Sequence, residues 1–274
     1  MFFVALLGCL FSCGVEGVQS ELQGRLNGED TNENSEQNNP GEQSAPPVAS
    51  APPVSTSRDT VSVVQFDSKT FLEDCNSTNY ELSYSIDLLL RSIEETSCQE
   101  ALPKLEKSRT LKLSDPEMKD LSFLRSFKQL TTLYIWDLSS ESTGWDSIQG
   151  LTGLSTFHLR GIQKKDLNFI SPLVNLSELV ISLNDEVQEL NFLGDFEKLQ
   201  TLRLWRLPSL TSVQTLEKTE SLIYFSAIST GITDLSPLTK HTQLEKVFAD
   251  RQEIVNCPQN TLSRFLNAFC AKQD

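Results

Sequence analysis

Side chains that could do chemistry are few in this 274-residue chain, and they are scattered along it. The sequence has only two histidines, His158 and His241, without any motif of a serine hydrolase, zinc protease, thiol oxidoreductase or phosphate-binding loop. We expect His241 to be exposed in a turn. The spacing of Asp115, Glu117 and Asp120 indicates a solvated turn rather than a metal-binding loop. The sequence therefore predicts no enzyme, no catalytic or metal-binding residue and no cofactor.

Two of the six cysteines lie in an N-terminal apolar segment. As a helix, the run 2–11 would span only about 15 Å, too short for a bilayer but suited to a secretory signal core. Leu stands three residues before Cys9 and before Cys13, which resembles the lipid-attachment signal of bacterial lipoproteins. We favour lipidation of Cys13, because four cysteines then remain, an even number suited to disulfides. Lipidation of Cys9 and secretion without a lipid are the alternatives.

This interpretation makes residues 1–13 a signal peptide and places the protein in the bacterial cell envelope, lipid-anchored at the outer membrane or surface. Residues 14–60 are polar and rich in Glu, Asn, Ser and Pro, so we expect a disordered tether. Within 16–60, eight acids and two bases contribute −6 to a net charge of −14. Because no Lys/Arg block occurs, nucleic acid is excluded as a partner, and membrane contact is expected only through the lipid.

The rest of the chain is dominated by an internal repeat. Seven segments fit the pattern L-x-x-L-x-L, and they begin at residues 108, 130, 154, 176, 199, 222 and 244. The second half of the unit also recurs, most clearly in Ile232-Thr-Asp-Leu-Ser-Pro-Leu238. The pattern resembles the internalin-like class of 22-residue leucine-rich repeats. That resemblance implies an α/β fold, a curved solenoid of about seven coils over 108–256, with a parallel β-sheet on its concave side.

Physical reasoning supports stacked coils, because a unit of this length has no core of its own and must bury its leucines against its neighbours. Within each strand, positions four and six should point inward and positions three, five and seven outward. One departure stands out. The family usually has Asn at position nine, whereas here Asn184 alone matches, which puts the regularity of the coils in doubt around 137–150.

Each open end of a solenoid needs a cap. Residues 61–107 are predicted to form a helical N-terminal cap, with a helix over 79–95 that begins at a Thr78–Glu81 capping box and a second helix that begins near Ser97. Residues 257–274 are predicted to form a helical C-terminal cap, whose apolar stripe begins at Leu262.

The remaining four cysteines lie as one pair near each end of the repeat. Six coil steps of about 4.8 Å separate the ends by roughly 30 Å, whereas a disulfide needs Cα atoms within about 7 Å. We therefore predict Cys75–Cys98 and Cys257–Cys270. Free thiols in a reducing compartment are the alternative.

The outward strand positions carry aromatic and basic residues of the types that dominate protein interfaces. The predicted ligand-binding residues are Tyr134, Trp136, His158, Arg160, Arg203, Trp205, Tyr224 and Phe248. Arg160 should also reach Trp136 for a cation–π contact. We therefore expect an envelope-anchored module that binds a protein or peptide partner on its concave face. A glycan-binding or adhesion protein and a structural envelope protein are the alternatives. The preference of aromatic residues for strands is a further explanation of their presence there.

Overall fold

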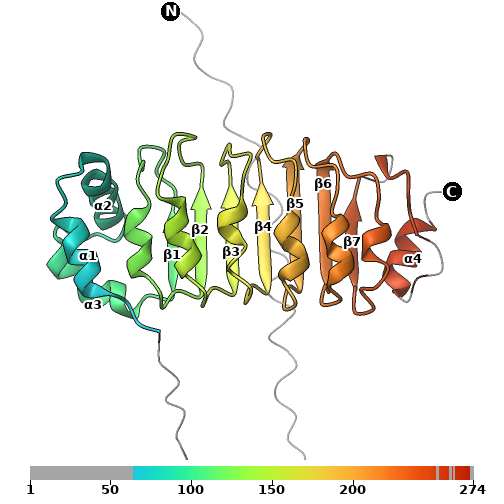
Figure 1. The fold of residues 1–274 in the computed structure, drawn as a ribbon, viewed down its shortest axis with the longest axis horizontal. Helices are drawn as coiled ribbons and strands as arrows, with labels where there is room; N and C mark the ends of the chain where they lie inside the picture. The colour runs from blue at the N-terminus through green and yellow to red at the C-terminus, as the bar shows by residue number, and fades with distance from the viewer. Residues whose placement is uncertain (1–63, 251–252, 259–260, 262, 272–274) are drawn as a thin grey trace, which may run out of the picture. The chain divides into compact units, whose positions relative to one another are not determined.

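The computed structural model describes residues 64–250, 253–258, 261 and 263–271 (Figure 1). The chain divides into two units, Met1–Asp59 and Thr60–Asp274, and every described residue belongs to the second. The predicted signal peptide, Cys13 and the tether lie outside the described residues. No helix among the described residues is long and apolar enough to cross a membrane.

Seven parallel strands form one open sheet in which sequence order equals spatial order (Figure 1). The strands are β1 Thr110–Leu113, β2 Thr132–Trp136, β3 Thr156–Arg160, β4 Glu178–Ser182, β5 Thr201–Leu207, β6 Tyr224–Thr230 and β7 Lys246–Ala249. Each pair is in register at equivalent repeat positions, so that Leu111 pairs with Leu133 and Leu133 with Phe157. The unit is therefore a leucine-rich-repeat solenoid of α/β class, as predicted.

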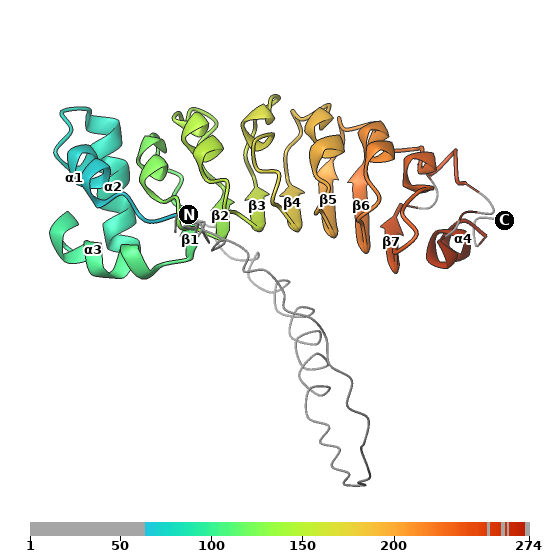
Figure 2. The same cartoon turned by 60° about the horizontal axis from the view of Figure 1, so that its bottom comes forward.

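Short 3₁₀ turns complete the coils on the side opposite the sheet (Figure 2). They are η1 Ser122–Ser126, η2 Trp145–Gly150, η3 Asn168–Ile170, η4 Asn191–Asp195, η5 Gln214–Lys218 and η6 Ser236–Leu238. A 3₁₀ turn has a longer rise per residue than an α-turn, so it closes a coil within 22–24 residues. The strands line the inner, concave side of the stack and the turns the convex side.

The core runs between these two sides as stacked columns. Strand positions four and six are buried from Leu111 and Leu113 through Phe225 and Ala227, as the alternation predicts. Each layer covers the next with apolar surface, and burial of each Leu or Phe stabilises the fold by about 1.5–3 kcal/mol. The core is continuous, so the coils depend on one another.

Position nine is buried in the five central coils, although only one of them has the usual Asn there. Leu138, Ile162 and Leu207 occupy it and extend the apolar core, with exposed fractions of 4%, 1% and 0%. Asn184 keeps the polar role, since its Nδ2 donates to the Lys164 carbonyl of the preceding coil at 2.9 Å. The expected irregularity around 137–150 does not reach the sheet, because β2 and β3 pair in continuous register. The longer connection ends at Gly144, with φ +73°.

Three helices cover the N-terminal end: α1 Ser68–Cys75, α2 Tyr80–Ser92 and α3 Cys98–Lys107. The predicted second helix does begin after Ser97, whose hydroxyl accepts a hydrogen bond from the Glu100 N–H. The predicted capping box at Thr78 is wrong. Asn79 is the N-cap, and its side chain accepts from the amides of Glu81 and Leu82, a role that Asn fills as well as Ser or Thr.

Helix α1 was not foreseen in the sequence. Phe66 and Phe71 pack edge-on against Phe127 of the first coil, with ring centroids 5.0 and 5.8 Å away. Buried Asp74 pairs with Arg125, although burial is the largest influence on the Asp74 carboxyl and raises its pKa. The cap is therefore joined to the repeat by aromatic packing and by a charge pair.

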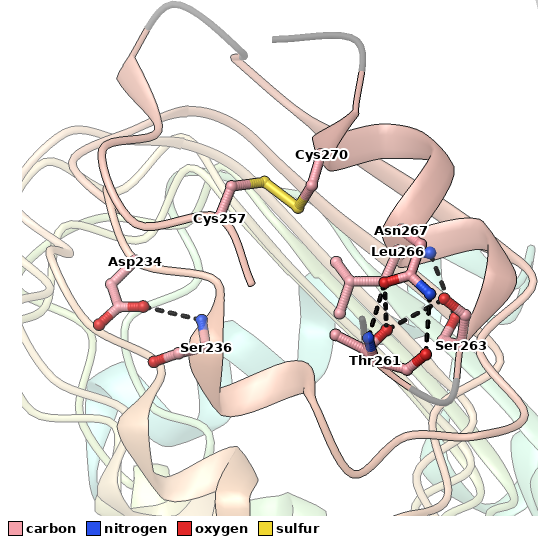
Figure 3. Close-up of a disulfide and its surroundings, with 8 residues drawn as sticks. All are labelled: Asp234, Ser236, Cys257, Thr261, Ser263, Leu266, Asn267 and Cys270. Carbon is pink, nitrogen blue, oxygen red and sulfur yellow. Dashed lines mark hydrogen bonds between the residues drawn. A yellow bond between two sulfur atoms is a disulfide. The ribbon is translucent and has the colours of Figure 1, made fainter. Parts of the chain in front are cut away.

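The structure contains both predicted disulfides. Cys75–Cys98 joins α1 to α3, with Cα atoms 6.5 Å apart, and Cys257–Cys270 joins the last loop to α4, with Cα atoms 5.5 Å apart. Helix α4, Arg264–Cys270, is shorter than the predicted stripe (Figure 3). Ser263 caps it and donates its hydroxyl hydrogen to the Leu244 carbonyl, which attaches the cap to the last coil.

Two expectations about turn residues are wrong. His241 is completely buried, because its ring fills the interior of the last turn instead of pointing to solvent. Asp120 is also buried rather than solvated: its Oδ1 accepts from the Ser122 N–H at 2.8 Å, and its backbone N–H donates to Ser85 of α2. Both side chains satisfy backbone groups at coil boundaries, a use that sequence position does not reveal.

Candidate binding face

The eight predicted ligand-binding residues all lie in the outward rows of the sheet. Tyr134, His158, Arg203 and Phe248 occupy the fifth position of their strands. Trp136, Arg160 and Trp205 occupy the seventh position, and Tyr224 the third. Parallel register places equivalent positions of adjacent strands side by side, so residues 22–24 apart in sequence become neighbours.

These rows include a chain of contacts that crosses the whole sheet with one residue from each strand. Its members, hereafter the seven-residue ladder, are Lys112, Tyr134, His158, Glu178, Arg203, Tyr224 and Phe248. Each member interacts with the next, by ring contact, cation–π contact or charge. The ladder joins five of the predicted residues with Lys112 and Glu178, which were not predicted.

At the β1 end, the ladder begins with a cation over aromatic rings. Nζ of Lys112 lies 5.4 Å from the Tyr134 ring centroid and 5.9 Å from that of Trp136. The Tyr134 ring in turn meets Trp136 and His158 edge-on, with centroids 5.5 and 4.8 Å apart. Such edge-to-face pairs contribute about 0.5–1.5 kcal/mol beyond area burial, so they fix the orientation of the rings.

In the middle of the sheet the ladder is polar. Nε2 of His158 lies 3.3 Å from Oε1 of Glu178. The His158 imidazole lowers the pKa of the Glu178 carboxyl, and Arg203 acts in the same direction, against partial burial, which raises it. Glu178 is therefore held as a carboxylate between two basic side chains.

Towards β7 the ladder becomes aromatic again. The Arg203 guanidinium lies 4.8 Å from the Tyr224 ring centroid, and Tyr224 contacts Phe248 at 5.5 Å. Phe248, the single aromatic residue of β7, is 44% exposed. The described protein thus leaves apolar surface open at this end.

The seventh-position row runs beside the ladder. The expected cation–π contact of Arg160 with Trp136 is not formed: Arg160 pairs instead with Asp137, Nη2 to Oδ2 at 3.7 Å, and Lys112 is the cation over Trp136. Three strands further on, Trp205 is 41% exposed, with the Arg206 guanidinium 5.1 Å from its ring centroid. Arg206 was not predicted, because it lies at position eight, where the alternating pattern of the strand has ended.

Position eight is a left-handed turn in each of five coils. Asp137, Gly161, Leu183, Arg206 and Ser229 have φ between +54° and +67°. A left-handed residue turns the chain sharply out of the strand, but it is disfavoured for side chains other than Gly. Gly161 is the single glycine in this set and so the only sequence signal of the feature. The turn places the side chain of Asp137 beside Arg160 and that of Arg206 over the Trp205 ring, on the strand face.

Two hollows flank the face. One, of ≈ 400 Å³, lies between α2 and the end of β1, and its lining includes Arg91, Ser92 and Lys112. The other, of ≈ 920 Å³, lies beyond β5–β7, and its lining includes Thr230, Asp250 and Glu253. No group of three or more His, Cys, Asp or Glu side chains that could hold a metal ion occurs within the described ranges. The arrangement presents cations and aromatic edges across an extended surface.

Comparison with known proteins gives similarities of fold. No protein-family model matches the sequence, and no curated protein matches it. Among solved structures, an internalin (InlF) from Listeria monocytogenes is 20% identical, with 72% of this chain and 67% of that chain covered and a TM-score of 0.41. Internalin C2 of the same species is 17% identical, with 68% of this chain and 97% of that chain covered and a TM-score of 0.38. A leucine-rich-repeat protein of Leptospira interrogans is 17% identical, with 59% of this chain and 46% of that chain covered and a TM-score of 0.46.

Proposed function

Because the chain is a leucine-rich-repeat solenoid with an aromatic and basic strand face, we propose that it is a binding module that holds a protein or peptide partner on that face. The carrying observation is the seven-residue ladder. Five of its six steps are side-chain contacts, and the sixth, between Glu178 and Arg203, is a charge interaction beyond ion-pair distance. The ladder is half-buried or exposed along its length. Rigid aromatic rings and Arg lose little entropy on binding, which is why they dominate interfaces.

A purely structural role accounts less well for this face. The core is complete at strand positions four and six, so the outward rings are not needed to fill it. Trp205 and Phe248 nevertheless remain more than two-fifths exposed within the described part of the chain. Exposed large apolar rings that lie beside cations favour a contact surface.

Photo-cross-linking can test the face directly. We would replace Phe248 with benzoylphenylalanine and use Phe265 of α4 as the matched control, since the two rings are exposed to 44% and 37%. Cross-links to a protein of the envelope fraction should form from position 248 and not from 265. They should disappear in the variant Trp136→Ala, Arg160→Ala, Trp205→Ala, whose circular dichroism should be unchanged. Equal cross-linking from both positions, or capture that survives in the triple variant, would contradict the proposal.

We further propose that a lipid on Cys13 anchors the module in the bacterial cell envelope. Two disulfides fit an exported protein, because cytosolic thiols are kept reduced. Mass spectrometry of the mature N-terminus should find acyl chains on Cys13, and Cys13→Ser should release the protein from the membrane fraction, whereas Cys9→Ser should not. Acyl chains on Cys9, or an N-terminus with no lipid, would overturn this assignment.

A further inference from the structure

We propose that the partner segment on the strand face is an acidic, extended peptide, whose carboxylates bind to the cations that stack on the aromatic rings. This inference rests on the proposed function and specifies its ligand. It depends on three features: the charge of the face, the occupation of its ring faces by cations, and a hollow at its β1 end that is lined by two cations and one carboxylate.

The strand face is basic although the chain is acidic overall, with a net charge of −14. Outward strand positions three, five and seven hold the cations Lys112, Arg160, Arg203 and Lys246. They hold only two carboxylates, Glu178 and, directly after β7, Asp250. A basic strip on an acidic molecule attracts and orients an anionic ligand, which the rest of the surface repels.

The carboxylates of the face are already engaged. Glu178 lies beside His158, Asp250 accepts a hydrogen bond from the Ser229 N–H, and Asp137 pairs with Arg160. The cations are different: none of Lys112, Arg203, Arg206 and Lys246 has a carboxylate oxygen within 4 Å among the described residues. The face therefore presents N–H donors that have no carboxylate partner, whereas each of its carboxylates already has a partner.

The cations also decide what the rings can bind. Lys112 lies over Tyr134 and Trp136, Arg203 over Tyr224, and Arg206 over Trp205. A neutral sugar needs an open ring face for stacking, and here cations lie over the ring faces. A guanidinium stacked on a ring still directs its N–H groups outward from its edge, where a carboxylate can accept two parallel hydrogen bonds. The geometry thus favours acidic side chains over neutral glycan.

The length of the face suits a peptide. Seven strands give six spacings, about 29 Å at about 4.8 Å each, which an extended chain of about nine residues spans. At the β1 end, the hollow of ≈ 400 Å³ adds Arg91 and Ser92 to Lys112, and its lining also includes Leu88, Met118 and Asp115. Asp115 accepts a hydrogen bond from the Glu117 N–H. With two cations against one engaged carboxylate, this hollow can accept a further acidic side chain or a terminal carboxylate.

The test uses the full chain with Cys13→Ser and three synthetic nine-residue peptides. The peptides share one apolar framework, and their alternate positions are all Glu, all Gln or all Lys. Fluorescence of Trp136 and Trp205 reports binding on the face. The Glu peptide should bind at least ten-fold more tightly than the Gln peptide, with an affinity that falls as salt rises. The Lys peptide should bind most weakly.

Single variants separate the ladder cations from overall charge. Lys112→Gln and Arg203→Gln should each weaken binding of the Glu peptide at least five-fold more than binding of the Gln peptide. Lys218→Gln, which removes an equal charge from η5 on the convex side, should change neither. Equal affinities for the Glu and Gln peptides, or an Arg203→Gln variant that binds the Glu peptide like the unaltered chain, would overturn the inference.

Three further outcomes are distinguishable. Binding of all three peptides with equal strength, lost in the triple Ala variant, would leave the proposed function standing and refute the acidic partner. No binding of any peptide, together with no cross-link from position 248, would refute both. Tighter binding of a soluble polyuronate than of the Glu peptide would assign the face to an anionic glycan and overturn the peptide assignment.

Discussion

The ring of His241 accepts a hydrogen bond from the backbone N–H of Leu222, the first residue of the same coil, through Nδ1 at 3.2 Å. Its Nε2 lies 3.1 Å from the Leu216 carbonyl. The buried imidazole is thus satisfied on both sides as the neutral Nε2–H tautomer. Burial lowers the pKa of His241, against the carbonyl of Leu216, which raises it.

This geometry predicts a loss of stability in mild acid. With a folded pKa below the ordinary value of about 6.5, the unfolded chain takes up the proton first as the pH falls. The contribution is therefore complete above about pH 6.5 and is lost as the pH falls towards the folded pKa. Chemical denaturation between pH 8 and pH 5.5 should show the free energy of unfolding decreasing.

The control is His241→Gln. It should lower the free energy of unfolding by about 1–2 kcal/mol at pH 8, because a buried backbone group loses its partner. The difference between the variant and the unaltered chain should then shrink towards pH 5.5, and His158, present in both proteins, cancels from it. A difference that stays constant with pH would show that His241 does not titrate in this range.

Glu178 should also lose its stabilising effect as the pH falls, but in a lower pH range than His241. His158 lowers the pKa of this carboxyl, so its stabilising effect is present above the ordinary value of about 4.3 and is lost as the pH falls through the folded pKa. Side-chain carbon NMR should find Glu178 titrating below that value, and His158→Gln should move the titration upward. Glu178→Gln should cost only about 0.5 kcal/mol at pH 7, because the pair is partly solvated. An unmoved titration in His158→Gln would contradict the contact.

Gly161 is the glycine that the coil turns require most. With φ at +67°, a Cβ there would also lie 2.1 Å from Oδ1 of Asp137. Gly161→Ala should therefore lower the free energy of unfolding by about 1–3 kcal/mol. The matched control is Gly150→Ala, where a Cβ meets nothing within 4 Å and the change should stay within about 0.5 kcal/mol. Thermal unfolding that ranks the two variants equally would refute this account.

The C-terminal disulfide should protect the end of the sheet. Cys257 and Cys270 are 13 residues apart and hold α4 against β7, where Ser263 also bonds to the Leu244 carbonyl (Figure 3). Replacing both cysteines with Ser should destabilise this end by about 2–4 kcal/mol and expose the edge of β7. Hydrogen exchange should speed up in β7 and α4 first, because repeat coils fray from their ends. Uniform acceleration across β1–β7 would show instead that the solenoid unfolds as one unit.

The sequence by itself determined the coils and their order. A unit of 22–24 residues cannot bury its leucines alone, so the recurring pattern requires stacked neighbours and one parallel sheet. The same reasoning placed Tyr134, His158 and Arg203 on the outward face, and distance along the stack was enough to predict both disulfides. These features follow from local periodicity.

Only the tertiary structure decided which outward residues touch. Lys112 and Glu178 join the ladder because strand register places them beside aromatic or basic residues twenty or more positions away. The left-handed turn at position eight, which brings Arg206 over Trp205, has almost no sequence signal because four of its five residues are not glycine. His241 was misjudged for the same reason: its ring bonds to the backbone of Leu222 in its own coil and of Leu216 in the preceding coil, which no local pattern records.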